Sequence, residues 1–270
     1  MKIGNKEFDT QRHTYIMGIL NVTPDSFSDG GQFNDYDAAM RHAEELIAGG
    51  SDILDIGGES SRPGHIVISP TEEIDRVAPL IEAVKKNFDV PVSVDTWKSE
   101  VAEVALKLGV DLVNDIWGFQ RDEKMAPLVK QYGAACCLMH NRREAVYQDL
   151  LPEIYADMEH CLQTAKAAGI DDDKIMLDPG LGFGKHWDMN LIVMNHLDYF
   201  TSLGYPLLLG ASRKGTIGKV LDLPPEEREE GTLVTTVLAV QNGYGFVRVH
   251  DAEKNRRAIK MTEAILGRGL

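Results

Sequence analysis

The sequence has too few cysteines and too little basic charge for several common classes of protein. Its three cysteines, Cys136, Cys137 and Cys161, are spaced for neither a disulfide framework nor a zinc site. We interpret them as small packing residues in a reducing compartment. The formal net charge is −14, whereas a nucleic-acid partner requires a basic face that neutralises phosphates. An anionic ligand would therefore have to be met by a few locally placed cations.

Long apolar runs are also missing. No run approaches the roughly 18–20 residues that a membrane helix requires. The N-terminus lacks the charged segment followed by an apolar one that marks a secretory leader. A hydrophobic content of 43% is that of an ordinary globular protein, and 270 residues are enough for a sizeable core. We expect a cytoplasmic protein that binds neither membranes nor nucleic acid.

Several catalytic signatures are absent as well. The eight histidines form no H-E-x-x-H pair, and no serine lies in a G-x-S-x-G elbow, which disfavours a zinc enzyme and a Ser-His-Asp hydrolase. The glycine-rich segment PGLGFGKH at residues 179–186 lacks the spacing of a Walker loop. Magnesium remains compatible with the sequence, because it binds through substrate phosphates and needs few protein ligands.

The sequence does contain a repeated order of strand, loop and helix. Short runs that are apolar on both sides of the pleat, as in parallel strands covered by helices, predict strands over residues 16–20, 51–56, 91–94, 110–113, 134–139, 175–177, 206–209 and 245–249. Helical spacing of apolar residues predicts helices over residues 36–48, 70–87, 98–108, 123–131, 152–168, 189–202, 229–242 and 252–266. One helix start is typical, because Ser69 precedes a proline and acidic residues.

This alternation predicts an α/β fold. Eight strand-helix units in a chain without an obvious linker indicate parallel strands that close on themselves, so we predict a single (β/α)8 TIM barrel domain over residues 1–270. An open doubly wound sheet is the alternative. It is disfavoured because no G-x-G-x-x-G lies between the first strand and the first helix.

Polar residues stand at the end of every predicted strand: Asn21, the Gly57-Gly58-Glu59 turn, Asp95, Asn114, His140, Asp178, Ser212 with Lys214, and Arg248 with His250. In a closed barrel the carboxyl ends of the strands form one ring, and active sites of such barrels lie there. Asp95, Asn114 and Asp178 offer acceptors that suit a flat heterocycle with several N–H donors.

Cations gather at the same ring: Arg62, Lys214, Arg248 and His250. In an acidic protein they indicate an anionic group, most simply a phosphate. Simpler interpretations also exist. Asp95 and Asp178 could cap the helices that follow them. Arg248 and His250 could form structural ion pairs with strand-end acids, and Lys214 could be solvated.

Several segments together resemble the signatures of the dihydropteroate synthase family. They are NVTPDSFSDGG (21–31), DIGGESSRPG (55–64), LDPGLGFGK (177–185), SRK (212–214) and RVHD (248–251). The resemblance spans essentially the whole chain and falls on predicted strand ends. It implies a transferase of folate synthesis that joins p-aminobenzoate to 6-hydroxymethyl-7,8-dihydropterin diphosphate. It also implies Mg²⁺ as cofactor, a homodimer and a sulfonamide target.

The resemblance further implies which residues contact each part of the substrates. The pterin would contact Asp95, Asn114, Asp178, Lys214, Met139 and Phe183. The diphosphate would contact Asn21, Ser61, Arg62, Arg248 and His250, with Mg²⁺ between its oxygens and Asn21. Around p-aminobenzoate would lie Phe27, Pro63, Phe183 and Ser212. We expect Lys214, Arg62 and Asp29 to be catalytic, with Asp25 as the alternative to Asp29.

The reaction expected from the family is a dissociative displacement at the methylene carbon. It needs no nucleophilic side chain, because the reduced pterin releases electrons and the cations stabilise the leaving group. The loops at residues 21–31 and 57–69 would exclude water from the cationic intermediate. On its own, the first of these loops could equally be a surface turn.

The sequence departs from the family pattern at two places. Ser61 stands where threonine is usual, and Gly215-Thr216 follows SRK where a serine and a bulky residue are common. The second departure weakens the inference about p-aminobenzoate affinity and leaves sulfonamide sensitivity open. Two other interpretations remain: a pterin-binding methyltransferase domain of corrinoid systems, which should lack the SRPG and SRK segments, and a non-catalytic pterin-binding protein.

Overall fold

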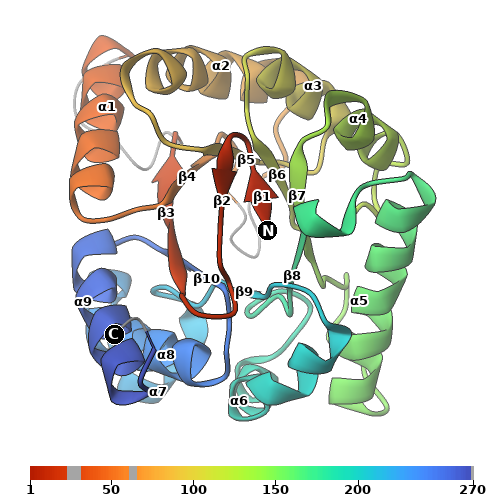
Figure 1. The fold of residues 1–270 in the computed structure, drawn as a ribbon, viewed down its shortest axis with the longest axis vertical. Coiled ribbons are helices and arrows are strands. Elements are labelled where there is room, and N and C mark those ends of the chain that lie inside the picture. Colours follow the sequence, from red (N-terminus) through yellow and green to blue (C-terminus); the bar gives the residue numbers. More distant parts are fainter. Residues whose placement is uncertain (23–31, 61–65, 269–270) are drawn as a thin grey trace.

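Parallel strands close into a barrel, and the helices surround it as an outer ring (Figure 1). The computed structural model describes residues 1–22, 32–60 and 66–268, except for the side chains of residues 32–35. The barrel strands are β3 (Tyr15–Asn21), β4 (Ile53–Gly57), β5 (Val92–Asp95), β6 (Leu112–Asp115), β7 (Ala135–Met139), β8 (Ile175–Asp178), β9 (Leu208–Leu209) and β10 (Phe246–Val249).

Strand pairing confirms the predicted TIM barrel. The eight strands follow one another in the order β8-β7-β6-β5-β4-β3-β10-β9, and each neighbouring pair is parallel. The barrel closes between β8 and β9, where Leu177 forms a parallel bridge with Leu207. The Leu177 N–H also donates to the Pro206 carbonyl at 3.0 Å. The alternative of an open sheet is therefore wrong.

The helices lie close to their predicted positions, with two differences. They are α1 (Gln32–Ala48), α2 (Pro70–Asn87), α3 (Ser99–Lys107), α4 (Met125–Tyr132), α5 (Leu150–Ala167), α6 (Trp187–Asn195), α7 (Gly215–Leu221), α8 (Glu229–Gln241) and α9 (Ala252–Ile265). Helix α7 was not expected, because its seven residues are too few for a periodic pattern. A 3₁₀-helix (Leu197–Leu203) replaces the second half of the single helix expected over residues 189–202.

Local signals explain where particular elements begin and end. Helix α2 starts after Ser69, whose Oγ accepts a hydrogen bond from the Glu72 N–H at 3.2 Å, as the sequence predicted. Helix α4 ends at Gly133, which has the left-handed conformation (φ +64°) that favours glycine. No helix in the described part of the chain is long and apolar enough to cross a membrane.

Side chains on the strands alternate between two apolar clusters. Ile16, Leu54 and Val113 face outward and pack under the helices. Met17, Ile53 and Leu112 face inward and fill the N-terminal half of the barrel. At the next inward positions toward the carboxyl ends the side chains become polar, as at Asp55 and Asn114, because successive residues alternate in direction along a strand. The expectation that the strands are apolar on both sides therefore fails at these polar positions and holds at others near the carboxyl ends, such as the buried Ile19 and Met139.

A short antiparallel hairpin, which was not predicted from the sequence, closes the N-terminal end of the barrel. It consists of β1 (Lys2–Ile3) and β2 (Lys6–Glu7), which lie across the barrel end in Figure 1. Ile3 and Phe8 are buried in the same cluster as the inward-facing residues. The Phe8 ring lies 4.8 Å from that of Tyr15 and 5.6 Å from that of Phe246. The hairpin thus seals the apolar end opposite the polar one.

All three cysteines are free and buried, as the sequence suggested. Cys137 belongs to the cluster inside the barrel, whereas Cys136 and Cys161 pack under the helices. Burial raises the pKa of Cys161 to about 12, so its thiol stays protonated. These residues serve packing and supply no reactive group.

The role of the hairpin can be tested with Phe8→Ala. Removing this ring opens a cavity against the apolar interior, so we expect the free energy of unfolding to fall by about 3 kcal/mol or more. Urea denaturation measures the change. Ile66→Ala, at a side chain that is 87% exposed, is the control and should change stability by less than about 0.5 kcal/mol. Similar small effects for both variants would show that the hairpin does not stabilise the barrel.

Candidate active site

Arg248 joins three strands at the polar end of the barrel. Its Nε donates to Asp55 Oδ2 at 2.6 Å, and its Nη2 donates to Asp95 Oδ2 at 2.7 Å. These residues lie on β10, β4 and β5, so the register of the strands brings them together. Burial raises the pKa of Asp95 to about 7. The charge of Arg248 opposes this rise, and the charge of Asp55 adds to it. Arg248 therefore does form ion pairs with acids of neighbouring strands, which was the simpler interpretation of this residue.

Asn114 on β6 belongs to the same group. Its Nδ2 donates to Asp55 Oδ2 at 3.1 Å, so one carboxylate oxygen accepts from both Asn114 and Arg248. Asp55 is fully buried, and Asn114 is nearly so. The nitrogen of the Asn114 amide therefore points toward Asp55, and this orientation follows from its partner, since a carboxylate can only accept.

A second group contains Asp178 at the end of β8 and Lys214 just before α7. Lys214 Nζ donates to the Leu181 carbonyl and lies 4.5 Å from the centre of the Phe183 ring. Burial lowers the pKa of Lys214 to about 8, against the attraction of Asp178. Burial also raises the pKa of Asp178, although Lys214 and the Gly180 N–H, 2.7 Å from Asp178 Oδ1, oppose that shift.

Both groups lie at the end of the barrel that the sequence predicted. The residues expected to contact the pterin occupy neighbouring strand ends, and Met139 is the register partner of Asp178. Ser212 and His250, expected at p-aminobenzoate and diphosphate respectively, contact each other: Ser212 Oγ lies 2.9 Å from His250 Nδ1. The His250 N–H donates to the same hydroxyl at 3.3 Å.

Asn21 offers the side-chain oxygen that we expected as a metal ligand. It ends β3 and is half-buried, and Gly57 is its register partner on β4. A Cβ at Gly57 would lie 3.1 Å from Asn21 Oδ1, so glycine leaves that oxygen open on one side. Within residues 1–22, 32–60 and 66–268, no cluster of three or more histidine, cysteine or acidic residues could hold a metal alone. This donor set fits a hard cation held mainly by its substrate.

A buried cluster that was not predicted from the sequence lies beneath the glycine-rich segment. Lys185 Nζ donates to the carbonyls of Gly180 (2.9 Å) and Phe183 (3.1 Å) and lies 2.7 Å from His140 Nδ1. Since Lys185 Nζ is a donor to both carbonyls, we assign His140 Nδ1 as its third acceptor. The His140 proton then lies on Nε2, 3.2 Å from Asp157 Oδ2. This cluster holds the segment that carries Phe183 and the carbonyl bonded by Lys214.

A second buried cation was also missed. Lys98 Nζ contacts Glu59 Oε2 at 2.6 Å, Glu73 Oε2 at 2.5 Å and the Ile68 carbonyl at 2.9 Å. The Ile68 N–H donates to Glu59 Oε2 at 2.9 Å. The two ends of the loop after β4 are thus joined to the segment after β5. Spacing alone could not reveal this contact, because Lys98 looks like an ordinary helix-start residue.

Some expected site residues lie outside the described part of the chain. They are Asp25, Phe27, Asp29, Ser61, Arg62 and Pro63. The residue that sequence reasoning missed at the barrel end itself is Asp55. It was present in the DIGGESSRPG segment but was taken as part of a buried strand, and the only available signal was a carboxylate within an otherwise apolar run.

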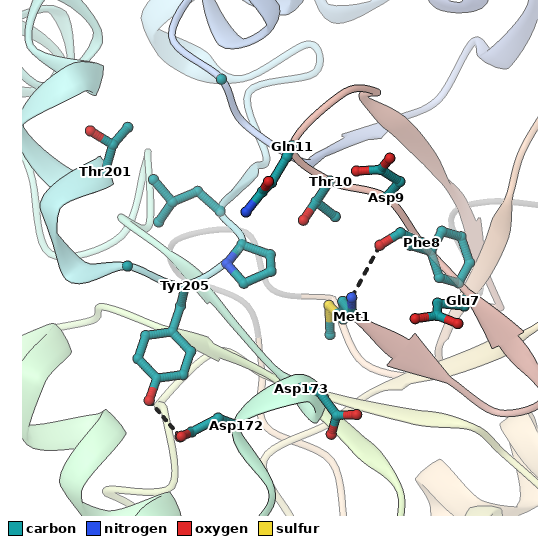
Figure 2. Close-up of a pocket in the computed structure, with 14 residues that line it drawn as sticks. Met1, Glu7, Phe8, Asp9, Thr10, Gln11, Asp172, Asp173, Thr201 and Tyr205 are labelled. Carbon is teal, nitrogen blue, oxygen red and sulfur yellow. Dashed lines mark hydrogen bonds between the residues drawn. The ribbon is translucent and has the colours of Figure 1, made fainter.

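The opposite end of the barrel has a cavity of about 810 Å³ that lies far from these groups. Figure 2 shows its two sides, where Tyr205 Oη donates to Asp172 Oδ1 at 2.5 Å and the Met1 amino group donates to the Phe8 carbonyl at 3.0 Å. No strand-end residue of the polar group lines this cavity. It belongs to the N-terminal face, whereas active sites of barrels of this kind lie at the C-terminal face.

Comparisons with known proteins agree with the geometry. A family model described as pterin binding enzyme matches residues 17–250. The dihydropteroate synthase of Clostridium beijerinckii is 54% identical over 99% of this chain and 100% of its own length. The crystal structure of a Clostridium difficile dihydropteroate synthase in the presence of pteroic acid has a TM-score of 0.94 and 49% identity, covering 96% of this chain and 99% of that one. A Yersinia pestis dihydropteroate synthase with a sulfonamide drug complex has a TM-score of 0.92 and 38% identity, covering 99% of each chain.

The His140 cluster predicts a specific dependence of stability on pH. Burial lowers the pKa of His140 to about 4, below its ordinary value of 6.5. The contribution of neutral His140 to stability is therefore complete above pH 6.5 and is lost as pH falls toward 4. In this range the histidine is protonated in the unfolded chain but stays neutral in the folded one. Between pH 7.5 and 5.0 the loss should be about 2 kcal/mol larger in the wild type than in His140→Asn.

Urea denaturation at both pH values measures this difference. Carboxylates away from His140 that titrate over the same range affect both proteins alike, so only the difference between the two proteins counts. His160→Asn serves as a control, because His160 is exposed on α5. Equal pH dependence in the wild type and His140→Asn would contradict a neutral, buried His140.

Proposed function

The chain belongs to the dihydropteroate synthase family of pterin-binding enzymes, and from this membership we propose how its own residues carry out the family's reaction. In this reaction the enzyme joins p-aminobenzoate to 6-hydroxymethyl-7,8-dihydropterin diphosphate and yields dihydropteroate and pyrophosphate. The observation that carries the proposal is the group of buried acceptors and cations at the polar end of the barrel. Neither a corrinoid-type methyltransferase nor a non-catalytic pterin-binding protein is favoured by any contact in this group.

Pterin recognition rests on Asp95, Asn114, Asp178 and Lys214. Two carboxylates and an amide oxygen accept hydrogen bonds from the amino and ring N–H groups of a pterin, and Lys214 donates to its carbonyl or ring nitrogen. Burial strengthens each of these contacts, because water cannot compete for them. Phe183 and Met139 supply apolar surface against the ring.

Diphosphate binding rests on cations and on a magnesium ion. Arg248 has N–H groups left after its two ion pairs, and His250 lies two residues further along the chain. The loop residues Ser61 and Arg62 complete this part of the proposal. When bound, Mg²⁺ supplies positive charge to the diphosphate oxygens, and Asn21 holds it through its amide oxygen.

The chemical step is a displacement at the methylene carbon of the pterin. The carbon–oxygen bond to the diphosphate breaks, and the leaving pyrophosphate takes the electron pair. The amine of p-aminobenzoate then forms the carbon–nitrogen bond and loses a proton. Arg248 and Arg62 stabilise the charge that develops on pyrophosphate, while Lys214 holds the pterin in place. Asp29, or alternatively Asp25, stabilises the cationic intermediate.

The second substrate lies between the loops and the end of β9. Phe27, Pro63 and Phe183 flank its ring, and Ser212 lies near it with its hydroxyl already bonded to His250. A sulfonamide would occupy the same place, by analogy with the Yersinia pestis relative. The short α7 begins at Gly215, which offers backbone N–H groups but no hydroxyl to the carboxylate.

We also propose that the protein works in the cytoplasm as a homodimer. Free, buried cysteines suit a reducing compartment. The consecutive helices α7, α8 and α9 pack side by side and carry large exposed apolar side chains: Val220, Leu221, Val234, Met261 and Ile265. Apolar surface of this kind is typical of a subunit interface.

The reaction itself is the direct test of the proposed function. Purified protein given pterin diphosphate, Mg²⁺ and p-aminobenzoate should form dihydropteroate and pyrophosphate in equal amounts, and chelation of Mg²⁺ should stop the reaction. Asp95→Asn should lower kcat/KM for the pterin diphosphate at least about 30-fold, because an NH₂ donor replaces one of the two acceptor oxygens and opposes the donors of the ring. Asp173→Asn, at the opposite end of the barrel, should leave the rate unchanged. Absence of any product that depends on p-aminobenzoate would refute the synthase proposal.

The dimer has its own test. Val234 is 60% exposed on α8, so Val234→Asp should place a charge in the interface and convert the dimer to a monomer. Light scattering after gel filtration measures the mass. Val146→Asp, at a side chain that is 68% exposed on the loop before α5, is the matched control and should remain dimeric. A wild-type protein with the mass of a single chain would contradict the homodimer.

A further inference from the structure

Asp55 has no assigned role, although it touches two of the groups proposed to bind substrate. It lies in the middle of β4, is 0% exposed and faces into the barrel. Its Oδ2 accepts from Arg248 Nε at 2.6 Å and from Asn114 Nδ2 at 3.1 Å. Asp55 lies two residues before the end of β4, so it is deeper in the barrel than the polar residues at the strand ends.

The contact with Asn114 decides what that amide presents to a ligand. A side-chain amide has a donor nitrogen and an acceptor oxygen, and either could face the substrate. Asp55 can only accept, so it holds the nitrogen. The oxygen of Asn114 then remains as the acceptor for a ring N–H. Asp55 in this way selects a ligand edge that is rich in donors.

The contact with Arg248 fixes the direction of the guanidinium. Of its five N–H groups, one on Nε is bound by Asp55 and one on Nη2 by Asp95. Two carboxylates on neighbouring strands thus hold the planar group from one side. The remaining N–H groups form a preorganised donor edge for an anion.

A purely structural ion pair is the alternative, but the arrangement does not favour it. Buried ion pairs add little stability compared with apolar residues of the same size. Asp55 also has an oxygen, Oδ1, without a partner among the described residues, as has its register neighbour Ser93 at Oγ. A residue selected for stability alone would satisfy both of its oxygens.

We propose that Asp55 is a positioning residue, which acts through Asn114 on pterin recognition and through Arg248 on diphosphate binding. The proposal rests on the proposed function, because it assumes that these two residues contact the pterin diphosphate. It predicts that the shape and acceptor oxygen of Asp55 matter more than its charge.

Three variants separate these properties. Asp55→Asn keeps the shape and one acceptor oxygen but removes the charge. Asp55→Glu keeps the charge but moves it by one methylene group. Asp55→Ala removes both acceptors. Ser93→Ala is the matched control, since Ser93 is equally buried on the neighbouring strand and its hydroxyl has no partner among the described residues.

Calorimetry with bare 6-hydroxymethylpterin and with its diphosphate, without p-aminobenzoate, measures the effect. Asp55→Ala and Asp55→Glu should weaken both ligands at least about tenfold. Asp55→Asn should restore the affinity for the bare pterin to within about threefold of the wild type, and Ser93→Ala should match the wild type. In steady-state kinetics the KM for p-aminobenzoate should stay unchanged in Asp55→Asn. Thermal unfolding confirms that each variant is folded.

A double-mutant cycle tests the route through Asn114. If Asp55 acts through that amide, Asp55→Ala should weaken bare pterin binding much less in an Asn114→Ala background than in the wild type. Fully additive losses would refute this route. If Asp55→Ala does not fold, the comparison of Asp55→Asn with Asp55→Glu decides: equal affinities in those two variants would overturn the proposal.

The outcomes also distinguish this inference from the proposed function. A wild-type enzyme that forms dihydropteroate while the Asp55 variants bind both ligands normally would overturn the inference and leave the function intact. A wild-type protein that binds pterin in an Asp55-dependent way but forms no dihydropteroate would overturn the function and leave the positioning role of Asp55 intact.

Discussion

The ion pairs of Arg248 with Asp55 and Asp95 are the contacts on which the rest of the polar barrel end depends. They join β10, β4 and β5 across a sequence separation of up to 193 residues. Two like-charged carboxylates on neighbouring strands would repel each other if the guanidinium did not lie between them. The raised pKa of Asp95 reflects that balance, because burial and Asp55 both favour its neutral form while Arg248 favours the ionised one. The barrel thus keeps two carboxyl groups in its interior by placing one guanidinium between them.

Two buried lysines play a related part at the loops. Lys185 holds the segment that carries Phe183, and Lys98 joins both ends of the loop after β4 to the start of α3. Each side-chain nitrogen is nearly enclosed and has several hydrogen-bond partners, so it ties together the segments that leave the barrel there. Segments with Gly, Pro and small polar residues have little packing of their own. The hydrogen bonds of these two lysines, which lie just beyond β5 and β8, fix where such segments leave the barrel.

Much of this organisation was predictable from the sequence, and the rest was not for a physical reason. Apolar strand segments that alternate with helical segments predicted the barrel. The polar residues that follow these strand segments predicted Asp95, Asn114 and Asp178 at one end. These signals are local. The contact of Asp55 with Arg248, in contrast, depends on strand register, and the short hairpin that carries Ile3 and Phe8 depends on the apolar barrel end it covers. Neither can be seen from residue spacing, because the partner lies far away in the sequence.

Charge balance at the polar end bears on how the proposed diphosphate would bind. Around Arg248 and Lys214 lie the carboxylates Asp55, Asp95 and Asp178, so the acids outnumber the cations in this group. Such a site attracts the N–H groups of a heterocycle and would repel a polyanion. The proposed Mg²⁺ and Arg62 would add positive charge to that of Arg248 at the place proposed for the diphosphate. A pterin edge and a diphosphate can then bind side by side, each in a field of the sign that it needs, within a protein whose net charge is −14.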